Sequence, residues 1–304
     1  IVLFTPRVNE LTPRGQSSFI AGYFYGCDLV SRARCSGSNQ GEIFYSIVPD
    51  PAGKWGDTHS HAAVMNTVPP VFAHEFQHMI NFARRGFTAD ALWLSEALAH
   101  TAEELIADVF AARGAAATAA VYRTSNYFRA QFYLSDPGAA SMIAEEPPGS
   151  LELRGAAWLF LRYLRAHYGG DDLLRRLTAS SRSGAANVAA ETGRPWAQLV
   201  AEFGVALYAD GAPELEGQLP TRYGFGGFDL RRTLAPVPGG YTLRPRPLSW
   251  VDAQVVSDVS SASHEHFLVT ATPATGAVPL TFIVAGRRGA PISTSDAITV
   301  SVTL

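Results

Sequence analysis

The sequence predicts an α+β fold in which a small mixed sheet lies over one helix, a helical lower half follows, and a small all-β sandwich-like module ends the chain. Three observations predict this order. Short runs rich in β-branched and aromatic residues occupy the first 48 positions, amphipathic segments follow from 71 to 209, and period-two runs appear after about 236. We therefore divide the chain into a domain of residues 1–235 and a C-terminal β module of residues 236–304.

Three strands are expected near the start of the chain. They cover residues 1–4, 21–25 and 41–48, with turn-forming Pro and Gly residues between the first two. Together they would form the sheet that covers the first long helix.

The first long helix is expected at residues 71–85. Pro69 and Pro70 suit a helix start, and Gly86 after two arginines suits its end. Apolar residues recur at the spacing of a buried stripe. They are Phe72, Phe76, Met79, Ile80 and Ala83. A second helix, from 93 onward, carries a stripe of Leu94, Leu98, Leu105 and Val109.

Later segments also have helical or strand periodicity. We expect helices at 115–133, 151–168, 171–179, 184–192 and 195–209. In the β module, the period-two runs are Leu280, Phe282 and Val284, and then Ile298, Val300, Val302 and Leu304. His264 and His266 lie on one face of a strand there and are expected to be structural or exposed rather than metal ligands.

Composition limits the class of protein. The 304 residues are 47% hydrophobic and 17% charged, which is typical of a globular protein rather than a disordered one. No apolar run approaches the ~20 residues of a membrane helix, so no membrane span is expected. The net charge is −3 with scattered arginines, which gives no support for nucleic acid binding.

Cys27 and Cys35 are the two cysteines of the chain. A disulfide between them would close a small loop and indicate an oxidising compartment, hence a secreted protein. Two buried thiols, or two zinc ligands, are the alternatives. The chain begins at Ile1 without Met or a signal peptide, as expected of a mature or excised form.

An H-E-x-x-H motif occupies residues 74–78. On a helix, His74 and His78 lie one above the other and can direct both imidazoles at one zinc ion. Glu75 lies beside that point and is the candidate general base. A third ligand is needed. A histidine six residues after the motif is excluded because position 84 is Arg, and Glu96 on the second helix is the candidate.

These residues resemble the gluzincin zinc peptidases, the group that includes thermolysin-like and aminopeptidase-N-like enzymes. The segment W-L-S-E-A-L-A at 93–99 is similar to the aminopeptidase pattern W-L-N-E-G-x-A, and hyicolysin-like secreted peptidases appear nearest. The resemblance covers 70–105 closely and 1–210 loosely. It implies Zn²⁺ held by His74, His78 and Glu96, with Glu75 as catalytic base and a peptide or protein as substrate.

The resemblance also implies further site features. An edge strand would pair with the substrate backbone, and 43–48 is the candidate. Glu103 and His100 are expected to orient a ligand histidine. Glu152 stands where aminopeptidase-N-like enzymes carry the Tyr that stabilises the oxyanion. The possible substitutes are His100, Tyr127, Tyr133 and Tyr163.

Two rival functions stay open. The missing Tyr is compatible with a catalytically silent binding or adhesion protein. An aminopeptidase would need an anchor for a free amine, such as a G-x-M-E-N-like segment, and none occurs. An endopeptidase is therefore preferred. His59 and His61 are expected to be cleft-side or solvated, and Glu145 and Glu146 to lie in a solvated loop rather than a calcium site.

Overall fold

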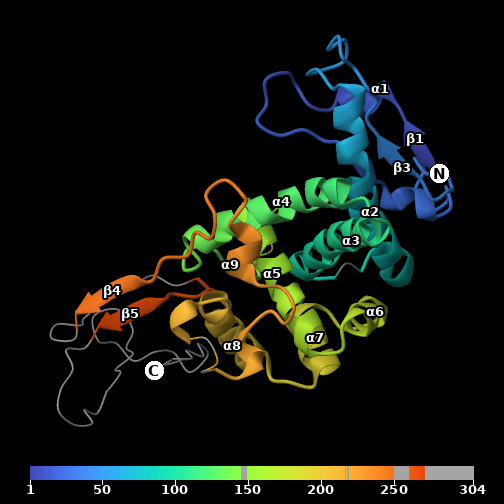
Figure 1. Cartoon of the computed structure of the whole chain (residues 1–304). Helices are drawn as coiled ribbons and strands as arrows, with labels where there is room; N and C mark the ends of the chain where they lie inside the picture. Colours follow the sequence, from blue (N-terminus) through green and yellow to red (C-terminus); the bar gives the residue numbers. More distant parts are fainter. Residues whose placement is uncertain (89, 145–148, 216, 218, 250–259, 271–304) are drawn as a thin grey trace, which may run out of the picture.

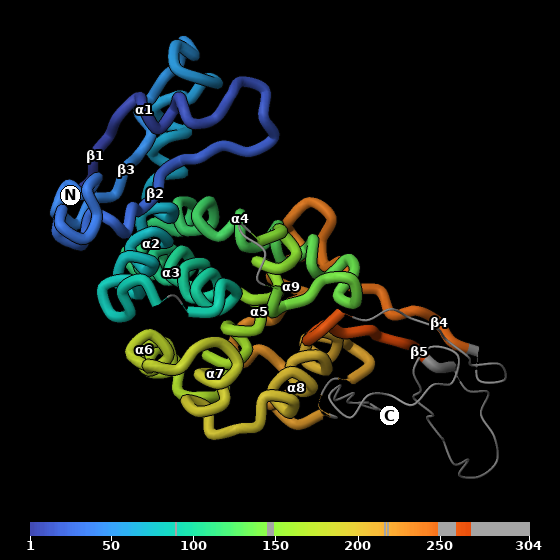
Figure 2. The backbone as a smooth tube through the Cα atoms, turned by 180° about the vertical axis from the view of Figure 1, so that it is seen from behind, coloured from blue at the N-terminus to red at the C-terminus, as the bar shows by residue number. Residues whose placement is uncertain are grey.

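The computed structural model describes residues 1–88, 90–144, 149–215, 217, 219–249 and 260–270. A small sheet lies at one end of the molecule, helices fill the middle, and a strand pair lies at the far end (Figure 1). The view from behind shows the same order (Figure 2). The described part of the chain is thus a mostly helical α+β structure.

The N-terminal sheet has three short strands, β1 (Val2–Phe4), β2 (Gly22–Phe24) and β3 (Phe44–Ser46). Their order is β1-β3-β2, with β3 parallel to β1 and antiparallel to β2. The prediction that 43–48 is an edge strand is wrong, because β3 is paired on both sides. β2 is an edge strand of the sheet, and it packs against the first long helix.

Helix α2 (His61–Arg85) begins earlier than predicted. Ser60 caps it by accepting a hydrogen bond from the Ala63 amide, so Pro69 and Pro70 lie inside the helix rather than at its start. The first turns persist because their apolar side chains are buried under the sheet, and tertiary packing outweighs the cost of two prolines. This cluster contains Val8, Ala21, Phe44, Ile47, Val64 and Val68.

Three further long helices form the centre of the molecule, and all three were predicted. They are α3 (Leu92–Ala112), α4 (Ala116–Ser135) and α5 (Leu151–His167). Residues 156–161 of α5 are almost completely buried in the main core. The predicted apolar stripes are only partly correct, since Phe76, Ala83 and Val109 are exposed.

Shorter elements complete the chain. Helices α6 (Asp171–Ala179), α7 (Gly184–Thr192) and α8 (Trp196–Ala209) match the predicted ranges within a residue. The unpredicted ones are α1 (Pro6–Asn9), α9 (Leu230–Leu234) and the 3₁₀ turns η1 (Gly26–Leu29), η2 (Pro213–Leu215) and η3 (Thr221–Tyr223).

Strands β4 (Arg246–Ser249) and β5 (Phe267–Thr270) pair in parallel. The segment just before β5 is attached to α8, because His264 Nε2 lies 2.8 Å from the carbonyl oxygen of Val200 and His266 Nε2 lies 2.8 Å from that of Gly204. Both histidines are therefore structural, as expected, but they precede β5 and do not lie on a strand as predicted. The predicted runs at 280–284 and 298–304 lie outside the described residues.

Cys27 and Cys35 form a disulfide, as predicted, with their Cα atoms 5.7 Å apart. The bond closes a short loop beside η1, so neither cysteine is a metal ligand. Among the described helices, none has both the length and the apolar character needed to cross a bilayer.

Candidate metal centre

Helix α2 brings the two motif histidines together. His74 is buried, His78 is partly exposed, and their Nε2 atoms lie 3.2 Å apart. The two rings are nearly perpendicular. One helical turn separates the residues, so both side chains leave the same face and converge on one point.

The other ring nitrogen of each histidine, Nδ1, already has a hydrogen-bond partner. His74 Nδ1 lies 2.8 Å from Glu103 Oε1, and His78 Nδ1 lies 3.1 Å from Ser95 Oγ. A carboxylate only accepts, so His74 donates through Nδ1, and in the neutral ring its Nε2 then carries a lone pair. Carboxylate-bound imidazoles of this kind are well oriented for binding metal through Nε2.

Glu96 of α3 completes the set. Its Oε1 lies 3.4 Å from His78 Nε2, and its Oε2 lies 3.7 Å from His74 Nε2. Oε2 is buried without a hydrogen-bond partner. Burial raises the pKa of Glu96, but the His78 hydrogen bond and the electrostatic interactions with His100 and His74 outweigh burial and lower the pKa to about 2. A carboxylate that stays ionised among lone pairs fits a cation, so these three residues could hold a metal ion.

Glu103 organises a second buried cluster behind the first. Its Oε1 also lies 2.9 Å from His100 Nδ1, while its Oε2 accepts from Arg129 at 3.0 Å. Burial raises the pKa of Glu103, but His100 and Arg129 lower it well below its usual range. His74, His100 and Glu103 are also close enough for an ion, but hydrogen bonds already link them. The structure thus places Glu103 and His100 where the sequence predicted supporting residues.

Burial is the largest influence on His100, which is completely enclosed. Together with the charge of Arg129, it lowers the pKa of His100 to about 3. For His74, the hydrogen bond and charge of Glu103 outweigh burial and raise the pKa. His100 is therefore neutral near pH 7, while the carboxylate beside His74 makes its imidazole more basic.

Glu75 lies on the neighbouring face of α2 and turns toward the sheet. Its Oε2 accepts a hydrogen bond of 3.0 Å from the Phe24 amide of β2. The unpaired edge of the sheet therefore fixes one oxygen of the candidate base. This contact also places β2, rather than β3, next to the motif.

Arg154, at the beginning of α5, approaches the same cluster. Its Nε lies 3.8 Å from Glu96 Oε2. Its side chain is 24% exposed and that of His78 is 23% exposed, against 10–11% for Glu96 and His74. His78 and Arg154 are therefore the more exposed members of this group.

The proposed substitutes for the missing Tyr lie elsewhere or are engaged. Tyr127 packs against Trp158 and Phe228. The Tyr133 hydroxyl lies 3.1 Å from His264 Nδ1, and the Tyr163 hydroxyl donates to Glu202 at 3.3 Å. His100 stays near Glu96, with Nε2 3.5 Å from Oε2, but it is completely buried.

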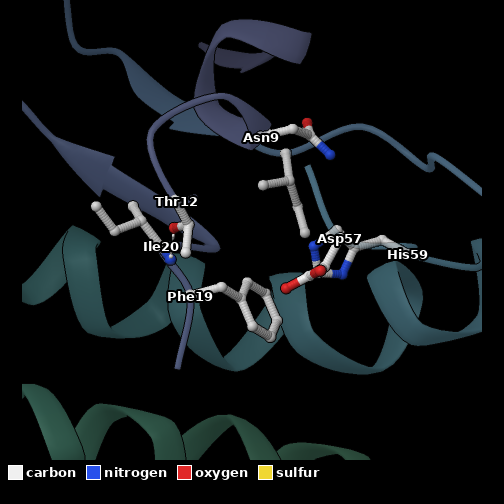
Figure 3. A pocket seen from close by; sticks show the side chains of 7 residues that line it. Asn9, Thr12, Phe19, Ile20, Asp57 and His59 are labelled. Atoms are coloured by element: carbon white, nitrogen blue, oxygen red, sulfur yellow. Dashed lines mark hydrogen bonds between the residues drawn. The ribbon is translucent and has the colours of Figure 1, made fainter. Parts of the chain in front are cut away.

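His59 and His61 do not join the metal cluster. His59 lines a small cavity of about 10 Å³ together with Asp57 and Phe19 (Figure 3). His61 is exposed at the start of α2. The exposed position of His61 agrees with the expected solvated role, and the cavity at His59 contains none of the candidate metal ligands. Glu145 and Glu146 lie outside the described residues.

Sequence reasoning missed three residues that contact this centre: Ser95, Arg129 and Arg154. The similar aminopeptidase pattern has a polar residue at the position of Ser95, and that signal could have identified it. Arg129 and Arg154 lie on α4 and α5, far along the chain from the motif, and no local pattern marks them.

Comparison of the chain with protein-family models and with curated protein sequences found no match in either set.

Proposed function

We propose that this chain is a zinc-dependent endopeptidase that holds its metal through His74, His78 and Glu96. The observation that carries the proposal is the convergence of two imidazole Nε2 atoms, 3.2 Å apart, on an ionised carboxylate with a buried unpaired oxygen. Two neutral imidazoles and one carboxylate form a ligand set typical of catalytic zinc. The resemblance of residues 70–105 to gluzincins supports the same assignment.

Bound zinc would supply a Lewis acid and make a water molecule easier to deprotonate. Glu75 takes the proton from the attacking water and delivers it to the leaving nitrogen of the peptide. The Phe24 amide holds one carboxylate oxygen of Glu75, so the other oxygen accepts the proton. Glu103 and Ser95 keep the ligand imidazoles oriented throughout.

The disulfide in an otherwise cysteine-free chain favours an oxidising compartment, and we extend the proposal to a secreted enzyme. A peptide or protein would reach the cluster beside its more exposed members, His78 and Arg154.

Replacing Glu75 by Gln tests the proposal. The amide keeps the shape of the side chain but cannot act as a base, so we expect turnover to fall by several orders of magnitude while zinc content stays equal to that of the wild type. Zinc is measured by mass spectrometry, and turnover is measured on a library of peptides blocked at both ends. Glu10→Gln is the matched control, because Glu10 is an exposed carboxylate that pairs with the exposed Arg7.

Near-normal turnover in Glu75→Gln would contradict the assigned base. A wild-type protein that binds zinc but cleaves no peptide would instead favour a binding protein. Cleavage of peptides with free amino termini, but never of blocked ones, would favour an aminopeptidase.

A further inference from the structure

A cleft of about 370 Å³ lies between the end of α5, the first half of α8 and the turn η3. This volume is within the range of small-molecule sites. Six side chains line the cleft: His167, Tyr168, Arg194, Gln198, Glu202 and Arg222. The rise along α5 from Arg154, which lies beside Glu96, to His167 is about 20 Å. The cleft is therefore separate from the metal centre.

Hydrogen bonds fix the sides of the cleft relative to each other. His167 Nε2 donates to the Gly224 carbonyl oxygen at 2.7 Å, which attaches the residue after η3 to the end of α5. Asp210, directly after α8, accepts a hydrogen bond of 3.0 Å from the Phe225 amide. A ligand would thus enter a cleft whose walls are already ordered, and pre-organisation of this kind favours binding.

Glu202 is the acid among the six lining residues, and its oxygens already have donors. Gln198 donates to Oε1 at 2.9 Å, and the Tyr163 hydroxyl donates to Oε2 at 3.3 Å. Arg222 Nε lies 3.7 Å from Oε1, and the Glu202 side chain is only 12% exposed. Glu202 therefore offers little to a cation from solvent, and its charge balances that of Arg222.

Arg194 has no such balance. Within the described ranges, no group forms a hydrogen bond or an ion pair with its guanidinium, and the residue is exposed. Burial and the charge of Glu202 raise the pKa of Tyr168. The charges of Arg194 and Arg222 oppose that rise, so both guanidinium groups act near the same hydroxyl. The cleft thus has an excess positive charge with unused donors, and a concave surface focuses the field of such a charge.

We propose that this cleft is a binding site for a small organic anion, held by Arg194 through a carboxylate or phosphate group. The planar fork of a guanidinium matches two oxygens of either group. Arg222 adds positive charge, and the ring of Tyr168 can cover an apolar part of the ligand. The proposal does not depend on the metal centre or on the peptidase function. The alternative is a hollow in which Arg194 contacts only water.

Calorimetric titration with two matched anions tests the proposal. Phenyl phosphate and benzoate carry the same ring with a phosphate or a carboxylate group, and benzyl alcohol is the uncharged control. We expect the preferred anion to bind with a Kd below about 1 mM and benzyl alcohol to bind about tenfold more weakly or less, because charge-assisted hydrogen bonds supply the affinity. The tighter of the two anions identifies the group that the cleft takes. Failure of both anions to bind in the millimolar range would overturn the proposal.

Arg194→Gln shows whether the anion lies in the cleft. We expect its affinity for the preferred anion to fall about tenfold or more, because the amide loses the charge and the planar fork. Arg175→Gln is the matched control, since Arg175 is a 74% exposed arginine that pairs with Asp172, and it should bind the anion like the wild type. Equal affinity in Arg194→Gln and the wild type would overturn the proposal. Circular dichroism of each variant confirms that the helices are retained.

Glu96→Gln separates this site from the metal centre, where a bound zinc ion would also attract anions. The variant loses a proposed zinc ligand but keeps the cleft, so we expect its anion affinity to equal that of the wild type. Anion binding that is lost in Glu96→Gln and kept in Arg194→Gln would place the anion at the metal and overturn the proposal, while the metal assignment would stand. Anion binding that is lost only in Arg194→Gln supports the cleft even if no peptide is cleaved.

Discussion

Two regions of helix α3 each carry a buried carboxylate, Glu104 and Glu96, and the surroundings of the two differ. Glu104 is surrounded by donors: Trp158 Nε1 donates to it at 3.0 Å, and Arg162 and Arg165 form ion pairs with it. Glu96, two turns earlier, is also buried, but it faces imidazole nitrogens and keeps one oxygen without a hydrogen bond. Two arginines pair with the first carboxylate, whereas among the described residues the second has one arginine, Arg154, at 3.8 Å.

Glu103 lies between Glu96 and Glu104 in the sequence, and its surroundings combine features of both. It accepts from His74, His100 and Arg129, so its charge is satisfied while it orients a predicted ligand. The comparison shows that burial of an acid does not mark a metal site. The informative feature is a buried acid that lacks donors beside side chains that also offer lone pairs.

The largest expected effect concerns stability. Glu104→Gln would leave Arg162 and Arg165 without their buried partner, and breaking such a pair costs about 3–5 kcal/mol in the free energy of unfolding. Urea unfolding of the metal-free protein measures this cost, and zinc affinity should change little. A stable variant with lost zinc binding would reverse our assignment of the two carboxylates.

Glu96→Gln should show the opposite pattern. Zinc affinity is expected to fall more than about 100-fold, because an amide oxygen is a weaker zinc ligand than a carboxylate. Changing a ligand should lower zinc affinity more than changing a residue that only orients a ligand. The unfolding free energy of the metal-free protein should change less than in Glu104→Gln. Equilibrium dialysis against zinc gives the affinity, and full zinc occupancy in Glu96→Gln or Glu96→Ala would remove Glu96 from the ligand set.

Glu103→Gln tests the intermediate case. Replacing the carboxylate that accepts from His74 Nδ1 by an uncharged amide, a weaker acceptor, should weaken zinc binding about 10–100-fold, as for other residues that orient a ligand histidine. Asp108→Asn is the control, since Asp108 lies on the same helix but is half-exposed and pairs with Arg123. If both variants bind zinc like the wild type, the support attributed to Glu103 is wrong.

The smallest effect is expected from His264, a partly exposed histidine whose Nε2 bonds the Val200 carbonyl of α8. Burial lowers the pKa of His264 to about 4 from an ordinary value near 6.5, so protonation favours the unfolded state. The contribution is fully present above pH 6.5 and is lost as the pH falls toward 4. Because the residue is partly exposed, we expect a cost of about 1–2 kcal/mol at pH 4.

The fluorescence of Trp196, at the start of α8, is a local probe for this loss. A His264→Gln variant should have a weaker dependence of stability on pH between 6.5 and 4 than the wild type. An identical pH dependence would show that other groups control the acid response.

The sequence predicted the long helices because their apolar periodicity is strong, and it predicted a candidate ligand set because His74, His78 and Glu96 lie on consecutive helices. The sequence did not predict the features that depend on packing between segments far apart in the chain. The start of α2 was placed at Pro69 because burial of Val64 and Val68 under the sheet could not be seen. The central position of β3 depends on pairing with β1, and the roles of Arg129 and Arg154 depend on how α4 and α5 dock.

The placement of the three predicted ligands on one helical hairpin has a consequence for folding. Closing a short loop costs less conformational entropy than closing a long one, and local contacts form sooner than distant ones. The α2–α3 hairpin therefore has a lower contact order than the arginine networks supplied by α4 and α5. An ion captured by the nascent hairpin would stabilise it as a template on which the later helices assemble.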